Sequence, residues 1–515
     1  MLLNFLKKEG KIMKFYITTP IYYPNSEPHI GTAYTTIACD VISRFYKQKG
    51  YNVFFITGTD ENSNKIIESA NKLNKDPKEY VDEMANLFKT IWNNLDIQYD
   101  KFIRTTEDYH IKTVQFVFKK LYDEGYIYKG LYEGWYCIHC ETFWPNSKVD
   151  DSKLCPNIEC QRPLNYIREE NYFFRLSYFQ DKLLKYYEDN PDFVYPDYRF
   201  NEVISFVKSG LQDLSVSRKY NNWGIKVPFD ENYSIYVWID ALTNYISALS
   251  YPFNLDLFNE YWEVAHHMVG KDIIRFHAVI WPSILMALNI KLPKKIIVHG
   301  WLTYDNQKIS KSKGGDVFNL KEIALSNDKI KISAIRYYLL REGSFGQDIP
   351  ISLDRFKYIY TSELSNNIGN LFSRVLAIID KKLDKQVFKE LDFKYVNYSF
   401  LEEKISNFDK ELSNFNYSKA ILEILSLSDY LNKIIENYKV WEIKDKSLNQ
   451  IMYELLYSLV ILNKMIYPFM PFIANNILEQ LNLDQNALKW DFKINDSFII
   501  KERKILFPKI ENVFA

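Results

Sequence analysis

The sequence predicts an α/β protein built on a doubly wound parallel sheet, with a segment inserted into the sheet and a helical C-terminal half. Three observations support this prediction. Residues 15–57 have the pattern of a strand, a helix and a second strand; residues 126–195 are rich in aromatic residues, turn residues and cysteine; and apolar residues recur at helical spacing after residue 362. The length of 515 residues is enough for about three domains, at roughly 150 residues each.

The pattern near the N-terminus predicts two parallel strands joined by a helix. Residues 15–19 are a β-prone run that stops at Pro20, and residues 53–57 are a second such run that stops at Gly58. Between them, apolar residues at helical spacing predict the helix: Ile30, Ala33, Ile37, Val41 and Phe45. Ligands of such sheets bind at the carboxyl ends of the strands, so we expect His29 and Asp60 to face one crevice.

The remaining strands of the sheet are expected after the inserted segment. Apolar runs at residues 233–240, 262–269 and 296–300 are interpreted as the second half of the sheet, and the last of them leads into a loop that carries Lys308. From residue 362 onward, apolar stripes predict a helical bundle. The stripes are Ile368, Leu371, Val375 and Ile378, then Ile421, Leu425, Leu431 and Ile435, then Leu455, Leu459 and Leu462.

Composition restricts the class of protein. Lysine plus arginine equals aspartate plus glutamate at 65 each, so no overall positive field attracts nucleic acid, and such a partner would need local basic patches and aromatic faces. No apolar run approaches the roughly 20 residues that span a bilayer, and residues 1–10 have too short an apolar stretch for a secretory signal. We therefore expect a cytoplasmic protein with no membrane partner.

Two separated segments have the chemistry of a polyphosphate site. Lys308 and Lys311 lie on a loop that ends in glycine, as suits a mobile cationic clamp, and His29 and Gly31 lie where a strand gives way to a helix. The amides at a helix start and the positive end of the helix dipole attract phosphate. A histidine before a helix is more often a surface residue or a cap, and a lysine cluster more often a solvated face. Their occurrence together on this fold favours ATP chemistry.

Four of the five cysteines lie close together, at Cys137, Cys140, Cys155 and Cys160. Clustered thiols in a large intracellular enzyme indicate a metal rather than a disulfide framework. Four thiolates can close a tetrahedral structural zinc site, which would leave no open position for catalysis. Cys137 and Cys140 have the spacing of a zinc knuckle, whereas four residues separate Cys155 from Cys160. The fourth ligand is therefore in doubt, and the candidates concerned are His139 and Cys160. The alternative is a set of free thiols in an aromatic core.

Six short segments occur in an order and at separations that chance does not explain. They are residues 18–25 (Thr-Thr-Pro-Ile-Tyr-Tyr-Pro-Asn), 28–31 (Pro-His-Ile-Gly), 57–61 (Thr-Gly-Thr-Asp-Glu), 236–241 (Tyr-Val-Trp-Ile-Asp-Ala), 270–272 (Gly-Lys-Asp) and 308–312 (Lys-Ile-Ser-Lys-Ser). On these segments the chain resembles the class I aminoacyl-tRNA synthetases and, within them, the methionyl-tRNA synthetases. The resemblance covers nearly the whole chain. It implies a Rossmann-like catalytic sheet, an inserted connective domain with a zinc knuckle, and an all-α anticodon-binding bundle.

The resemblance also implies domain boundaries. We expect a first catalytic half at residues 1–125, in which residues 1–13 are an extension and Met13 is an alternative start. The connective insertion is expected at 126–215, the second catalytic half at 216–325, a region that contacts the tRNA stem at 326–365, and the anticodon-binding domain at 366–515. Because the chain stops soon after the bundle, without an appended tRNA-binding domain, we expect a monomer.

The reaction that the resemblance implies has two steps. ATP and L-methionine give methionyl-adenylate and pyrophosphate with Mg²⁺, and the 2′-hydroxyl of the terminal adenosine of tRNA(Met) then attacks the activated carbonyl. The expected catalytic residues are His29, Lys308 and Lys311, which would stabilise charge on the phosphates. The expected nucleotide contacts are these three together with Gly31, Lys271, Asp272 and Ser310. The signature of the family usually ends in a second histidine, where this chain has Thr32, which cannot carry positive charge.

The resemblance implies a methionine pocket that recognises shape and a polarisable sulfur. Asp60 would anchor the substrate ammonium through a charge-assisted hydrogen bond. The other expected pocket residues are Ile21, Tyr23, Trp238, Ala241, Tyr245, Phe276 and His277, with Tyr23 and His277 as polar groups near the thioether. An aromatic residue outside these motifs would more often belong to the core.

In the helical half, the resemblance implies that Asn370, Arg374 and Trp441 read the anticodon of tRNA(Met). Asn370 and Arg374 are one helical turn apart, and an exposed indole can stack on a base. A proline usually precedes this tryptophan, whereas this chain has Val440, so the local backbone is expected to differ. The alternative is that these residues are ordinary features of a helical bundle.

Three other functions remain as alternatives. A synthetase for Leu, Ile, Val or Cys would share both ATP signatures, although the insertion is too small for a large editing domain and its thiols do not lie in the amino-acid pocket. A nucleotidylyltransferase on the same fold would not need the helical half. A non-catalytic tRNA-binding relative would be expected to lose His29 or Lys311, and both are present.

Overall fold

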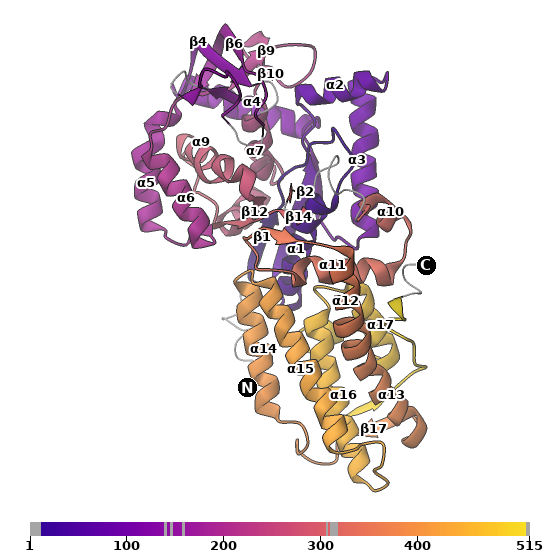
Figure 1. Ribbon diagram of the computed structural model, residues 1–515. Helices are drawn as coiled ribbons and strands as arrows, with labels where there is room; N and C mark the ends of the chain where they lie inside the picture. The colour runs from indigo at the N-terminus through magenta and orange to yellow at the C-terminus, as the bar shows by residue number, and fades with distance from the viewer. Residues whose placement is uncertain are drawn as a thin grey trace.

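The computed structural model describes residues 12–137, 142–144, 148–156, 160–304, 307–308 and 318–510 (Figure 1). It confirms the predicted strand, helix and strand near the N-terminus. These are β1 (Lys14–Thr18), α1 (Ile30–Gln48) and β2 (Asn52–Thr59), and β1 pairs with β2 in parallel. No helix in the described part of the chain is long and apolar enough to cross a membrane.

The central sheet has six parallel strands in the order β3-β2-β1-β12-β13-β7. Besides β1 and β2 it contains β3 (Lys101–Arg104), β12 (Ala265–Gly270), β13 (Lys295–His299) and the short β7 (Val194–Tyr195). The strands predicted at 262–269 and 296–300 are therefore confirmed. The edge strand β7 comes from within the segment interpreted as the insertion, so that segment returns to the sheet before it ends.

The strand predicted at 233–240 in this sheet is wrong. Residues Asp230–Ile235 form β11 of a separate antiparallel sheet, with β9 (Ser217–Lys219) and β10 (Lys226–Val227), and helix α7 (Val237–Ser247) follows at once. The apolar run spans a strand end and a helix start without a glycine or proline between them. A short apolar run cannot be assigned to strand or helix from its hydrophobicity alone, which is why the pattern misled.

Helices cover both faces of the central sheet, as a doubly wound fold requires. Side chains of a strand alternate between the two faces, and here Phe15 and Ile17 belong to one apolar core while Tyr16 belongs to the other. The first core contains residues of α1 and α3 (Pro77–Asn94). The second contains residues of α4 (Asp108–Asp123), α7 and α9 (Trp281–Ala287).

The inserted segment forms its own four-stranded antiparallel sheet at the far end of the molecule from the bundle (Figure 1). Its strands are β4 (Ile127–Cys137), β5 (Thr142–Trp144), β6 (Asn165–Phe174) and β8 (Leu214–Ser215), in the order β5-β4-β6-β8. Helices α5 (Gln180–Asp189) and α6 (Asp197–Lys208) lie between β6 and β8 in the chain.

The C-terminal half confirms the predicted helical bundle. Its long helices are α13 (Asn370–Lys382), α14 (Tyr398–Ser413), α15 (Tyr417–Asn437), α16 (Ser447–Ile466) and α17 (Pro471–Leu481). Helices α10 (Leu320–Leu325), α11 (Lys329–Arg341) and α12 (Leu353–Ile359) connect the central sheet to the bundle. Two short strands, β17 (Gln386–Phe388) after α13 and β18 (Ser497–Ile499) after α17, pair with each other in antiparallel orientation.

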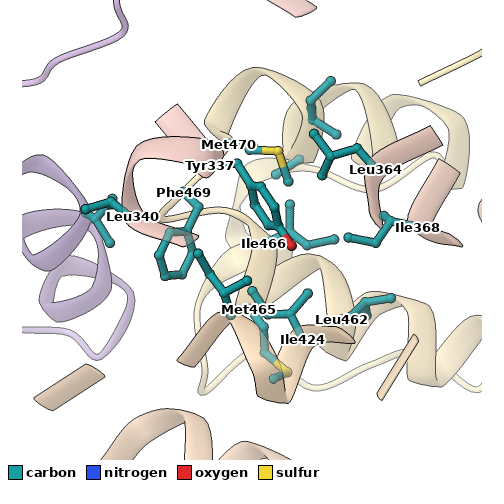
Figure 2. Close-up of a cluster of buried hydrophobic side chains, with 14 of the residues drawn as sticks. Tyr337, Leu340, Leu364, Ile368, Ile424, Leu462, Met465, Ile466, Phe469 and Met470 are labelled. Carbon is teal, nitrogen blue, oxygen red and sulfur yellow. The ribbon is translucent and has the colours of Figure 1, made fainter. Parts of the chain in front are cut away.

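The part of the chain that contains the central sheet shares one apolar core with the bundle. Figure 2 shows Tyr337 of α11 next to Ile466 of α16, Leu340 of α11 next to Phe469, and Leu462 of α16 in the same apolar region. These five side chains are almost completely buried and belong to the same cluster as the residues of β1 and α1. The two halves are therefore held as one body by burial of apolar surface, not by a few surface contacts.

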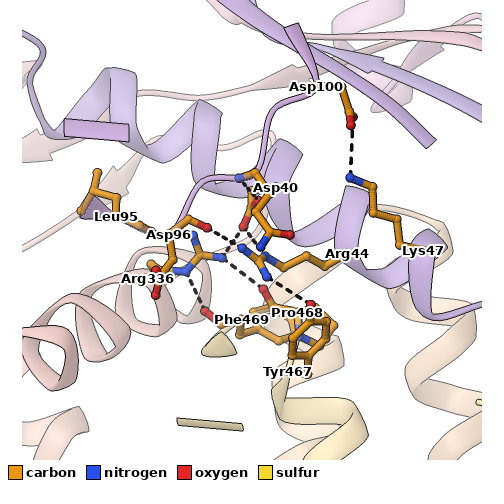
Figure 3. Close-up of polar contacts among 11 residues, drawn as sticks. Asp40, Arg44, Lys47, Leu95, Asp96, Asp100, Arg336, Tyr467, Pro468 and Phe469 are labelled. Carbon is orange, nitrogen blue, oxygen red and sulfur yellow. Dashed lines mark hydrogen bonds and ion pairs between the residues drawn. The ribbon is translucent and has the colours of Figure 1, made fainter. Parts of the chain in front are cut away.

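A buried group of charges lies at the same boundary (Figure 3). Asp40 Oδ2 of α1 accepts hydrogen bonds from Arg44 Nε at 2.7 Å and from Arg336 Nη2 of α11 at 2.6 Å, and all three side chains are buried. Arg336 also donates to the backbone carbonyls of Phe469 at 3.0 Å and Leu95 at 3.0 Å. Burial by itself raises the pKa of Asp40, but Arg44 and Arg336 outweigh it and hold that pKa below its usual value. We call Asp40, Arg44 and Arg336 the joint cluster.

Candidate active site

A cavity of about 360 Å³ opens at the carboxyl ends of β1, β2, β12 and β13, where a doubly wound sheet binds its ligands. The cavity brings together ten of the residues predicted from the sequence. They are Ile21, Tyr23, His29, Gly31, Asp60, Trp238, Ala241, Tyr245, Asp272 and His277. Phe276 and Lys271 are not among its lining residues.

His29 is the residue that caps the start of α1. Its backbone is extended, at φ −123° and ψ 172°, and its Nδ1 accepts a hydrogen bond from the Gly31 N–H at 3.1 Å. Because Nδ1 is an acceptor, the proton of the neutral ring lies on Nε2. A Cβ atom at position 31 would lie 2.9 Å from His29 Cε1, so a larger residue there would displace this ring.

Asp60 follows β2 directly and is almost completely buried. Its backbone N–H donates to the Tyr22 carbonyl at 2.9 Å, and the Tyr22 N–H donates to the Gly58 carbonyl at 2.9 Å. The neighbouring Glu61 is held by Arg104 through two hydrogen bonds, of 2.8 Å and 3.0 Å. The backbone on both sides of Asp60 is therefore fixed, which orients its carboxylate at the cavity wall.

Two aromatic pairs form the apolar side of the cavity. Trp238 and Phe276 stack with ring centroids 3.5 Å apart and planes 8° from parallel, so Phe276 supports a wall residue from behind. The Tyr245 hydroxyl and His277 Nε2 are 2.6 Å apart, and His277 Nδ1 is 3.1 Å from the Ile273 carbonyl. Burial lowers the pKa of His277 to about 4 and raises that of Tyr245 well above its usual value. Both groups are thus neutral near pH 7, with His277 donating from Nδ1 and accepting at Nε2.

Lys271 and Asp272, predicted as a pair, have different positions. Asp272 lines the cavity. Lys271 forms an ion pair with Asp348 at 2.7 Å and lies over the Trp301 ring, 3.8 Å from its centroid. The Trp301 N–H also donates to Asp348, at 2.9 Å. Lys271 therefore joins the end of β12 to the segment around Asp348.

Sequence reasoning missed several lining residues. They are Asn25, Glu27, Tyr34, Thr35, His299, Gly300 and Trp301. Three of these follow or end β13, the strand predicted at 296–300. The rule that placed Asp60 at the carboxyl end of β2 applies equally to His299 and Trp301, so a signal for them was present.

The lysine loop falls mostly outside the described residues. Residues 307–308 form β15, which pairs with β14 (Leu302–Tyr304), and Leu302 lines the cavity. The Lys308 side chain, Ser310 and Lys311 are not described. The structure therefore brings the backbone of Lys308 to a strand beside the cavity and does not test where the ammonium groups lie.

Three of the four predicted metal ligands lie together in the insertion. The sulfur atoms of Cys137, Cys155 and Cys160 all lie within 4.8 Å of one another, and those of Cys137 and Cys160 are 3.5 Å apart. Zn–S bonds of about 2.3 Å in a tetrahedral site place sulfurs about 3.8 Å apart, so this spacing fits zinc. Cys160, one of the two doubtful ligands, belongs to the group. Cys140 and His139 lie outside the described residues.

The three candidate anticodon residues lie at one end of the bundle. Asn370 is exposed, and Arg374, also on α13, lies with its guanidinium 5.9 Å from the centroid of the Trp441 ring. Trp441 is 46% exposed, as stacking on a base requires. Arg374 also forms an ion pair with Glu436 at 3.3 Å.

Residues 438–446, which connect α15 to α16, are here called the Trp441 loop. The Val440 N–H donates to the Ile435 carbonyl at 3.2 Å, a hydrogen bond that proline cannot make. Together with Lys439, at φ 45°, this bond ends α15 in the manner of a Schellman motif. Lys382 of α13 donates to the backbone carbonyls of Trp441 and Ile443. The loop that presents the indole is thus fixed from both sides.

Comparison with known proteins identifies the family. A family model described as "tRNA synthetases class I (M)" matches residues 15–166 and 158–376, and one for the anticodon-binding domain of tRNA ligases matches residues 397–510. The chain is 45% identical over 513 residues to a methionine–tRNA ligase of Caldanaerobacter subterraneus subsp. tengcongensis, covering 96% of this chain and 79% of that protein. The chain belongs to the class I methionyl-tRNA synthetases.

Two further members of this synthetase family match this chain over nearly their whole length. A methionine–tRNA ligase of Rickettsia conorii is 43% identical over 516 residues, covering 96% of this chain and 99% of that protein. A structure of the methionyl-tRNA synthetase of Mycobacterium tuberculosis in complex with methionyl-adenylate matches with a TM-score of 0.90 and 34% sequence identity, covering 96% of this chain and all of that one. Membership of the synthetase family agrees with the sequence-based assignment and with the class I fold described above.

Proposed function

We propose that this chain activates L-methionine with ATP, giving methionyl-adenylate and pyrophosphate, and transfers the methionyl group to tRNA(Met). One observation supports this above the others. His29 and Gly31, at the start of α1, line the same cavity as Asp60, Trp238 and His277. One cavity thus combines a helix start that can bind phosphate with aromatic side chains and the buried Asp60 carboxylate, as a nucleotide and an amino acid with an uncharged side chain require.

On the nucleotide side, the start of α1 supplies positive potential from its backbone amides, to which the neutral His29 ring adds an Nε2–H donor. Hydrogen bonds to the α-phosphate gain strength as charge builds up in the transition state. Asp272 suits the ribose hydroxyls. Lys308 and Lys311 are proposed to neutralise the departing pyrophosphate, with Ser310 in the same loop. Mg²⁺, when bound with the nucleotide, would neutralise part of the phosphate charge.

On the amino-acid side, Asp60 binds the ammonium and presents the carboxylate of methionine to the α-phosphorus. The stacked Trp238 and the Tyr245–His277 pair surround the thioether with neutral groups, so no charge is left unpaired against an apolar side chain. No protein nucleophile is needed, because the carboxylate of methionine attacks phosphorus and the adenylate is already a reactive acyl donor.

The experiment that tests the activity is ATP–pyrophosphate exchange, run with each of the twenty amino acids, followed by charging of tRNA(Met). Exchange should depend on methionine. A response to isoleucine or cysteine instead would assign the chain to another specificity, and exchange without tRNA charging would favour a nucleotidylyltransferase.

A variant at Asp60 tests the site. Asp60→Asn should raise KM for methionine about 30- to 150-fold, since a hydrogen bond to a charged group contributes about 2 to 3 kcal/mol. Asp192→Asn is the matched control, because Asp192 is exposed on the surface. An Asp60→Asn enzyme with unchanged KM would remove this carboxylate from the proposed site.

We further propose that Cys137, Cys140, Cys155 and Cys160 hold a structural zinc ion. The ion would link β4 to the segment around Cys155 and stabilise the tip of the insertion. Purified protein should contain about one zinc per chain, and Cys155→Ser should lose it while lowering the unfolding temperature of the insertion. Zinc content unchanged in Cys155→Ser would exclude this ligand set.

The helical half is proposed to bind the anticodon loop of tRNA(Met) through Asn370, Arg374 and Trp441. Trp441→Ala should weaken binding of an anticodon stem-loop about 5- to 150-fold, since stacking of one base contributes about 1 to 3 kcal/mol. It should leave pyrophosphate exchange unchanged. We also expect a monomer in the cytoplasm, and light scattering of the purified protein tests the oligomeric state.

A further inference from the structure

Thr32 occupies the position at which the family signature usually has a second histidine, and its hydroxyl is bonded twice to His29. The His29 N–H donates to Thr32 Oγ1 at 3.1 Å. The Thr32 hydroxyl in turn donates to the His29 carbonyl at 2.7 Å. With the bond from the Gly31 N–H to His29 Nδ1, these contacts form a reciprocal capping arrangement around one residue.

This arrangement leaves the threonine without a donor for phosphate. A hydroxyl has one hydrogen and two acceptor positions. Its hydrogen is used by the His29 carbonyl, and phosphate oxygens are acceptors only. Thr32 therefore cannot take over the phosphate contact of the missing imidazole while the cap is formed.

The backbone of Thr32 is tied to the other wall of the cavity. Its carbonyl accepts hydrogen bonds from Thr36 Oγ1 at 2.9 Å and from the Tyr22 hydroxyl at 3.2 Å. Tyr22 is also the residue whose carbonyl accepts the Asp60 N–H at 2.9 Å. A continuous set of hydrogen bonds therefore runs from His29 through Thr32 and Tyr22 to Asp60.

We propose that Thr32 is a positioning residue for methionine activation: it acts on the reaction only through His29, by fixing the backbone and the ring of that residue at the start of α1. The inference depends on the proposed synthetase activity. The role differs from that of a phosphate-binding residue: Thr32 lines the cavity, but its hydroxyl hydrogen is held by the His29 carbonyl. In this signature, His29 alone then supplies an imidazole contact to phosphate, and its position is fixed by the hydrogen bonds with Thr32.

A double-mutant cycle on methionine-dependent pyrophosphate exchange tests this. Thr32→Val removes the hydroxyl at nearly constant volume and should lower kcat about tenfold, with KM for methionine unchanged within about twofold. In a His29→Ala background the same substitution should cost less than about twofold, because the imidazole through which Thr32 affects the reaction is already absent. An equal loss in both backgrounds would overturn the proposal, and so would Thr32→Val with wild-type kcat.

Two rescue variants separate positioning from folding. Thr32→Ser keeps the hydroxyl, and Thr32→Gln replaces it by the acceptor that capping boxes commonly use at this position, so both should stay within about threefold of the wild-type kcat. If both are as slow as Thr32→Val, the cap is not the cause of the loss. Thermal unfolding of each variant shows whether a loss reflects the fold.

Ser43→Ala is the matched control, because it removes a hydroxyl from the same helix. The Ser43 hydroxyl has no hydrogen-bond partner among the described residues, so its exchange rate should equal that of the wild type. A wild-type enzyme with no methionine-dependent exchange would refute the proposed function itself. An active wild type with an unaffected Thr32→Val variant would refute only the role of Thr32.

Discussion

Arg336 of the joint cluster offers a prediction whose size follows from its contacts. The Arg336→Met substitution removes a guanidinium that is completely buried. It deletes hydrogen bonds to Asp40, Leu95, Phe469 and Pro468, of which the last three accept through backbone carbonyls (Figure 3). The carbonyls stay buried without this donor, and Asp40 retains only Arg44 as a cationic partner.

The expected cost is about 3 to 5 kcal/mol, the range observed when one partner of a buried charge pair is removed. Unfolding entropy of about 2.1 cal/mol/K per residue over 515 residues gives about 1.1 kcal/mol/K, so the midpoint should fall by about 3 to 5 °C. A smaller cooperative unit has a smaller unfolding entropy and would shift further, which makes about 3 °C the minimum.

Differential scanning calorimetry measures this shift. Lys185→Met is the matched control: Lys185 forms ion pairs with Glu188 and Asp189, but its side chain is 66% exposed, so its loss should move the midpoint by less than about 1 °C. Arg336→Lys keeps the charge but not the planar fork and should fall between the two. An Arg336→Met midpoint within 1 °C of the control would refute the reasoning that the joint cluster stabilises the boundary.

Three further predictions concern the pocket and the bundle. Gly31→Ala should lower methionine-dependent exchange about tenfold or more, because the new Cβ would lie 2.9 Å from His29 Cε1; a wild-type rate would mean that the ring lies elsewhere in the working enzyme. Burial lowers the pKa of His277 to about 4, so NMR titration should find this imidazole neutral from about pH 6 to pH 8. The unfolded imidazole takes up a proton below about pH 6.5 and the folded one does not, so His277 should reduce the stability of the fold as pH falls from about 6.5 to 4, which unfolding midpoints would detect. Lys382→Met should make the Trp441 loop more susceptible to trypsin, because it removes the donor to the Trp441 carbonyl; equal cleavage rates would exclude this support.

Features that depend on local pattern were predictable from the sequence. The two strands and the helix between them follow from runs of apolar residues within 45 positions, and the rule for parallel sheets converts a strand end into a position in space. That rule placed His29 and Asp60 at one cavity before any contact was known. Cys137, Cys155 and Cys160 likewise came together as their clustering in the sequence predicted.

Features that depend on distant partners were not predictable in this way. Lys271 looks like a nucleotide contact beside Asp272, but its partner Asp348 lies 77 residues later, and no local pattern indicates that pairing. The hydrogen bonds between Thr32 and His29 were equally hidden, since a substitution in a signature shows what is lost and not what the new side chain bonds to. The strand expected at 233–240 failed because hydrophobicity is similar for a buried strand and a buried helix.

Helix α1 connects the joint cluster to the candidate active site. It has 19 residues, and Asp40 lies ten positions beyond Ile30. At about 1.5 Å per residue, the joint cluster therefore holds the helix about 15 Å from its N-terminal end. A rotation of α1 by about 4° about Asp40 would displace its N-terminal end by about 1 Å. A displacement of this size at a catalytic group can lower the rate about a hundredfold. A rotation of the bundle helices against the central sheet would therefore change the position of the His29 imidazole.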